Sequence, residues 1–245
     1  FAQGFHLDTD KVYNVDYQKG VHYRGKIKGD ADSVAAFNFF DGQCNGIFSG
    51  SALVNVVVGK LERSNSSDYI IYSDTDLKVR DHFDCKTDDA PKPTAQANPE
   101  TVLSARCITM YLEVDYSLYQ QNGSLTATAN WMTSVFNNVQ TIYTNDGISI
   151  ALRSSFIWTT PDPYDNIGTD SADYLDAFQV NRPLFDAEVA HLLGIDPGGM
   201  GGRANMGYNL CDSYGRHAYA DVNLSYSTVP VYSWTIKVIA HETGH

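Results

Sequence analysis

The five residues His241-Glu242-Thr243-Gly244-His245, which end the 245-residue chain, carry the side chains best suited to chemistry. In a helix, a spacing of four residues places two side chains on one face, one turn apart. The two imidazoles can therefore bind one zinc ion, and the Glu242 carboxylate can reach a water molecule at that metal. A catalytic zinc normally has three protein ligands, so His241 and His245 are an incomplete set.

A helix must position these residues. Ile236, Ile239 and Ala240 recur at helical spacing and predict a final helix over 234–245, with the histidines beside its apolar face. Gly244 lacks a β-carbon, so we expect another backbone to approach the helix closely there.

The rest of the second half alternates between strand and helix patterns. Strands are predicted around 108–114, 148–152 and 189–193, and helices at 124–143 and after Asp170 or Ser171. The order strand, helix, strand, helix, strand predicts right-handed crossovers on a mixed, mostly parallel sheet with packed helices.

The first half of the chain has a different pattern. Frequent turn signals, such as Asp41-Gly42, separate β-branched runs and predict a β-rich module. Prolines at 91, 93 and 99 predict an extended linker. We therefore expect an α+β protein with a β-rich domain at 1–90, a linker at 91–104 and a second domain at 105–245.

Composition narrows the class of protein. A net charge of −12 disfavours nucleic acid as a partner, and no apolar run approaches the length of a membrane span. Sixteen Tyr, with many Asn, Ser, Thr and Gly, are typical of a secreted or extracellular protein. The chain opens without Met and ends inside the predicted helix, so we expect both ends to be cut.

The remaining candidate ligands give weaker signals. The cysteines are Cys44, Cys85, Cys107 and Cys211; none is at C-x-x-C spacing, which excludes a cysteine zinc finger, and the sequence leaves all three full pairings open. The other histidines are expected to pack or to lie at the surface instead of supplying a third zinc ligand: His6, His22, His82, His191 and His217. The glycines at 198–202 lack the Lys-Ser/Thr of a phosphate loop.

The segment 234–245 resembles the active-site helix of metzincin peptidases. The closest likeness is to the adamalysin (reprolysin-like) group, including its secreted bacterial members. Similar runs occur at 111–116, 211–215 and 226–233, and 22–27 through 46–49 is similar to the C-terminal part of the family's pro-domain. The likeness covers most of the chain and is strongest from Cys107 onward.

The resemblance implies a secreted zinc metalloendopeptidase precursor, a zymogen that hydrolyses polypeptides. His241 and His245 would bind zinc and Glu242 would act as general base. The family pattern continues as H-E-x-x-H-x-x-G-x-x-H, so the third histidine would lie beyond His245 and this segment alone is expected to be inactive. The resemblance also implies an edge strand at 203–210 that pairs with substrate, and calcium as an optional second metal.

Many zymogens of this kind hold a cysteine thiolate on the zinc, and Cys85, just before the linker, is the candidate here. A disulfide or a surface thiol explains Cys85 equally well. Cys211 is expected in a disulfide, with Cys107 or with a cysteine beyond the chain end. Two rival functions remain: a catalytically silent binding or adhesion module on the same fold, and a zincin with a distant Glu as third ligand.

Overall fold

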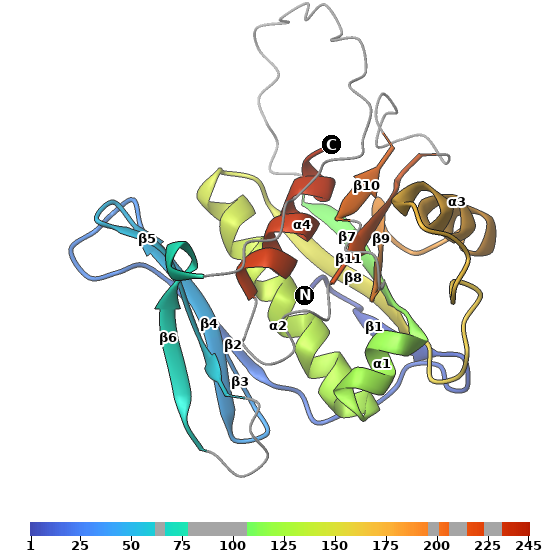
Figure 1. Cartoon of the computed structure of the whole chain (residues 1–245), viewed down its shortest axis with the longest axis horizontal. Helices are drawn as coiled ribbons and strands as arrows, with labels where there is room; N and C mark the ends of the chain where they lie inside the picture. Colours follow the sequence, from blue (N-terminus) through green and yellow to red (C-terminus); the bar gives the residue numbers. More distant parts are fainter. Residues whose placement is uncertain (62–66, 78–106, 196–200, 206–214, 223–231) are drawn as a thin grey trace, which may run out of the picture.

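The computed structural model describes residues 1–61, 67–77, 107–195, 201–205, 215–222 and 232–245. Over these ranges the chain forms two β-sheets, four α-helices and a short 3-10 helix, η1 (Asp74–Asp76), as Figure 1 shows. The α-helices are α1 (Tyr116–Asn122), α2 (Leu125–Asn145), α3 (Ser171–Asn181) and α4 (Tyr232–Gly244). The predicted α+β class is confirmed.

The larger sheet has six strands in the order β1-β8-β7-β9-β11-β10. Its strands are β1 (His6–Thr9), β7 (Ile108–Val114), β8 (Ile150–Ile157), β9 (Val189–Gly194), β10 (Gly202–Ala204) and β11 (His217–Asp221). All neighbouring pairs are parallel except β10 with β11. Parallel neighbours need crossover connections, and α1 with α2, then α3, supply them between β7, β8 and β9. The predicted mostly parallel sheet is therefore confirmed.

Both faces of this sheet are covered by helices. Met110, Leu112 and Val114 alternate along β7 and join the apolar cluster that includes α2 and α4. Tyr111, between them, joins a second cluster with α3. Because successive strand side chains point to opposite faces, α2 and α4 lie on one side and α3 on the other (Figure 1). The active-site helix thus packs on a sheet that is buried on both faces.

The smaller sheet is an antiparallel meander in the order β2-β3-β4-β5-β6. Its strands are β2 (Val21–Gly25), β3 (Val34–Phe40), β4 (Gln43–Gly50), β5 (Leu53–Lys60) and β6 (Tyr69–Ser73). Asp41 and Gly42 join β3 to β4 with φ values of 49° and 67°. Positive φ at both central residues is the mark of a tight two-residue hairpin, so the predicted turn is confirmed.

Helix α2 lies between the two sheets, and its polar side is buried. The Asn137 side-chain amide donates to Asn38 Oδ1 at 2.9 Å. Asn130 accepts from the Gly20 backbone N–H at 2.9 Å and donates to the Gln18 carbonyl oxygen at 3.0 Å. Buried amides need such partners, and here they join the helix to the smaller sheet and the chain before it.

The two halves of the sequence meet in space. Strand β1, from the segment expected to form the first domain, pairs in parallel with β8 and adds an edge to the larger sheet. The predicted linker at 91–104 lies outside the described residues, so the domain boundaries stay a prediction. Of the helices described, none combines the length and hydropathy that a membrane span requires.

Candidate active site

Helix α4 presents the H-E-x-x-H residues on its last turn. Trp234, Ile236, Val238 and Ile239 are all at most 8% exposed and belong to the core cluster shared with α2. The helix begins at Tyr232, two residues earlier than predicted, and ends one residue before His245. Packing of its apolar side therefore decides how the terminal residues face.

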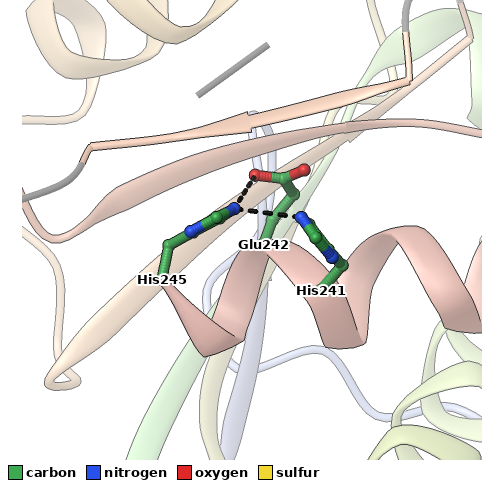
Figure 2. A group of neighbouring side chains, drawn as sticks. All are labelled: His241, Glu242 and His245. Atoms are coloured by element: carbon green, nitrogen blue, oxygen red, sulfur yellow. Dashed lines mark hydrogen bonds and ion pairs between the residues drawn. The ribbon is translucent and has the colours of Figure 1, made fainter. Parts of the chain in front are cut away.

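The two imidazoles converge. Their Nε2 atoms lie 3.0 Å apart, and the rings meet edge to face with centroids 4.7 Å apart. His245 Nε2 is 3.9 Å from a carboxylate oxygen of Glu242. Figure 2 shows the two rings turned toward one another with the carboxylate beside them. One potential ligand atom from each of the three side chains lies within 4.8 Å of the others.

This donor set fits zinc. Two nitrogens bound to a tetrahedral zinc at about 2.05 Å would be about 3.3 Å apart, close to the 3.0 Å between the Nε2 atoms. Partial burial, and to a lesser extent the Lys237 charge, lower the pKa of His241 and favour the neutral form that binds metal. Among the described residues, no other group of three or more His, Cys, Asp and Glu could hold a metal.

The Glu242 carboxylate is inside the protein, whereas the two histidines reach the surface. Glu242 is 2% exposed. The β10 backbone passes directly over it: a β-carbon added to Gly202 would lie 2.5 Å from Glu242 Cγ and 2.6 Å from its Oε1. The close approach expected at Gly244 is absent, because a β-carbon there would meet only the Tyr143 hydroxyl at 3.5 Å. That prediction was wrong, and Gly202 is the glycine that proximity requires.

The comparison with protein families decides the class. Residues 104–245, more than half of the chain, match the reprolysin model described as metallo-peptidase family M12. The chain belongs to metallo-peptidase family M12. The resemblance of this M12 chain to metzincin peptidases is thereby confirmed.

Two solved structures are similar to the M12 chain at low identity. Metalloproteinase-II from Bacteroides fragilis is 15% identical with a TM-score of 0.46, and the match covers all of this chain and 74% of that one. A chain in the structure of a chaperone-substrate complex is 13% identical with a TM-score of 0.40. That match covers 86% of this chain and 27% of the other, so the M12 chain spans about a quarter of its length.

A cavity of about 290 Å³ borders the M12 motif. It is lined by residues 242–245 of the motif, by Tyr143, and by the first residues of β9 and β11. Ala204 and Asn205, at the end of β10, complete one wall. In the strand order β10 is an edge strand, as the resemblance implied for 203–210, although residues 206–210 lie outside the described ranges.

The structure does not bring the other predicted residues to the motif. Cys107 is exposed and carries a free thiol. Cys85 and Cys211 lie outside the described residues, so the switch and the disulfide stay predictions. His82 also lies outside them. The three-ligand cluster does not include the remaining histidines that are described, namely His6, His22, His191 and His217.

Sequence reasoning missed three residues that contact the M12 helix. Gly202 lies against Glu242. The Tyr143 hydroxyl donates to the Ala240 carbonyl oxygen at 2.7 Å. His191 Nε2 lies 3.0 Å from Thr243 Oγ1. The packing role expected of His191 is confirmed, since it is 1% exposed in the middle of β9. Its contact with the motif depends on a long-range pairing for which the sequence holds no local signal.

Proposed function

We propose that the protein is a zinc metalloendopeptidase made as a precursor. The observation that supports this most directly is the pair of Nε2 atoms 3.0 Å apart with a buried carboxylate 3.9 Å from one of them. His241 and His245 would hold the metal together with a third ligand from outside the described cluster. Zinc, when bound, supplies a Lewis acid that lowers the pKa of water and polarises the scissile carbonyl.

Glu242 has the position of a general base. It is fixed by burial and by the β10 backbone, yet one oxygen lies beside the ring of His245. In the proposed reaction its carboxylate takes a proton from the attacking water as the new C–O bond forms. It then delivers that proton to the amine as the C–N bond breaks. His241 and His245 remain neutral throughout, as ligands.

Strand β10 is the proposed place for the substrate backbone. It is three residues long, it is the last strand in the sheet order, and Gly202 brings it against Glu242. An extended peptide can add to such an edge through backbone hydrogen bonds. This arrangement would hold the scissile bond near the base and favours polypeptide over small-molecule substrates.

Glu242→Gln tests the proposed role of the base. The amide keeps the shape of the side chain but cannot accept a proton in this way. We expect the full-length variant to bind zinc normally and to lose about 10²- to 10⁴-fold in kcat on a peptide substrate. Asp176→Asn, on the exposed side of α3, is the matched control and should keep full activity. Retained turnover in Glu242→Gln would remove this residue from the role.

Latency through Cys85 is part of the proposal, supported by the likeness of the first half to a pro-domain. A thiolate is a good zinc ligand and would take the position of the catalytic water. Cys85→Ala should raise the activity of the unprocessed precursor, whereas Cys44→Ala should leave it unchanged. Equal latency in both variants would refute the switch.

We also propose that the protein acts outside the cell, in keeping with its composition. Recovery of the processed enzyme from the medium of an expressing culture would support this, and its retention in the cell pellet would oppose it. A calcium site is not proposed, because the described residues contain no second cluster of three acidic or other ligand side chains.

A further inference from the structure

The last turn of α4 needs support from outside the helix. Gly244 is the last helical residue, and His245, a proposed zinc ligand, follows it. The last four carbonyl groups of a helix have no partner within the helix, and such ends fray. The α4 backbone alone therefore does not hold the His245 imazole ring in place beside His241.

Side chains from two other elements contact this turn. The Tyr143 hydroxyl, on α2, donates to the Ala240 carbonyl oxygen at 2.7 Å. His191, in the middle of β9, places Nε2 3.0 Å from Thr243 Oγ1. Thr243 lies between Glu242 and His245 in the motif, so this contact acts on the turn that carries both.

The direction of the His191 contact follows from the number of hydrogens. A threonine hydroxyl has one hydrogen, and that of Thr243 is directed at the Ile239 carbonyl oxygen at 2.7 Å. Thr243 Oγ1 must then accept, so His191 donates through Nε2–H. The other ring nitrogen of His191 has no hydrogen-bond partner among the described residues, which agrees with a lone pair there, since a buried unpaired N–H costs more.

Helix geometry links this bond to the metal ligands. At about 100° per residue, His245 lies about 40° around the helix from His241. Thr243 lies about 200° around from His241, which is opposite the mean direction of the two imidazoles. A bond that keeps Thr243 facing the sheet therefore keeps both rings facing away from it, toward their common point.

We propose that His191 is a positioning residue of the zinc site: its Nε2–H donates to Thr243 and fixes the rotation and order of the last α4 turn. This inference rests on the zinc site proposed above. His191 touches neither zinc nor substrate and acts only through Thr243 and His245.

Two substitutions remove the bond from opposite ends. His191→Leu removes the donor at similar side-chain size, and Thr243→Val removes the acceptor with little change of shape. His191→Gln can restore an N–H donor. His217→Leu is the matched control: His217 lies on the neighbouring strand β11, is 4% exposed, and bonds to the Arg182 carbonyl group instead of α4.

Zinc affinity of the full-length protein, by competition with a chromophoric chelator, is the first measurement. We expect about 10-fold weaker binding in His191→Leu and in Thr243→Val, and near wild-type binding in His191→Gln and His217→Leu. Unchanged affinity in both bond-deleting variants overturns the proposal. An equal loss in His217→Leu also overturns it, because general destabilisation would then be the cause.

Hydrogen exchange of the metal-free protein separates this proposal from the proposed function. The backbone amides of Gly244 and His245 should exchange faster in His191→Leu and Thr243→Val than in wild type and in His217→Leu. Unchanged exchange sinks the positioning role. If exchange changes as expected but wild type fails to bind zinc, the positioning role holds and the proposed peptidase function fails.

Discussion

Gly202→Ala places one methyl group against the proposed general base. The added β-carbon would lie 2.5 Å from Cγ, 2.6 Å from Oε1 and 2.8 Å from Cδ of Glu242. Ordinary contacts begin at 3.4 Å, so something must move by about 0.9 Å. Gly202 starts strand β10, which is hydrogen-bonded to β11, whereas Glu242 is a side chain with rotatable bonds. The carboxylate is therefore the group that moves.

The size of the effect follows from this displacement. A misplacement of about 1 Å in a reacting group can cost about 10²-fold in rate. We expect kcat of Gly202→Ala to fall by about 10²-fold. Zinc affinity should change little, because His241 and His245 are not among the atoms that the methyl meets. The overlap should also cost about 1 to 3 kcal/mol of the free energy of unfolding.

Peptide-cleavage kinetics of the full-length enzyme, with a zinc-binding titration and a urea melt, measure these three quantities. Gly25→Ala is the matched control, because Gly25 is also a strand glycine and its added β-carbon would meet nothing within 4 Å. In a Glu242→Gln background, Gly202→Ala should cause little further loss of rate, since the base is already absent. Wild-type kcat in Gly202→Ala, or an equal loss in both backgrounds, would refute the reasoning.

Three further predictions concern stability. Burial lowers the pKa of His191 to about 3 from 6.5, so its contribution to stability is complete above pH 6.5 and is lost as pH falls toward 3. Roughly 4 to 5 kcal/mol is at stake, and urea melts of His191→Gln between pH 4 and 7 should show a flatter pH dependence than wild type. Burial raises the pKa of Asp115 to about 8 from 3.8, despite backbone N–H donors at both oxygens, so its contribution is complete below pH 4 and is lost as pH rises through 8. Asp115→Asn should therefore flatten the fall in unfolding free energy over pH 4 to 8, and an unchanged slope would contradict the assignment. Arg182 Nε donates to the fully buried Glu113 at 2.6 Å; Arg182→Met leaves that carboxylate without its cation and should cost about 3 to 5 kcal/mol in the same melts, whereas a loss below 1 kcal/mol would contradict the reasoning.

Local patterns predicted the elements of the second half well. Helix α2 begins at Leu125 after the Ser124 cap, and α3 begins at Ser171 after Asp170, as the cap residues and apolar spacing indicated. Strand β7 occupies the predicted residues. These features depend on neighbours within a few residues, and such information is contained in any short stretch of sequence.

Features that depend on distant contacts were not predicted. Asn130 and Asn137 on α2 looked like a solvent-facing side of an amphipathic helix, but the smaller sheet and the chain before it bury them and satisfy their amides. Strand β1 looked like part of a separate module, but it pairs with β8. A short polar or β-branched segment has many acceptable partners, and only the assembled sheet selects one.

The candidate site divides in the same way. His241, Glu242 and His245 were identified from spacing alone, because residues four apart on a helix share a face whatever surrounds the helix. Their surroundings came from the tertiary structure: Gly202 over the carboxylate, and Tyr143 and His191 on the last turn. These three residues come from β10, α2 and β9, up to 102 positions from the motif residues they touch, and only packing of the sheet against α4 brings them there. The sequence by itself determined which atoms can bind a metal, and the tertiary structure decided which groups hold those atoms in place, because side-chain spacing is a local property and contact is not.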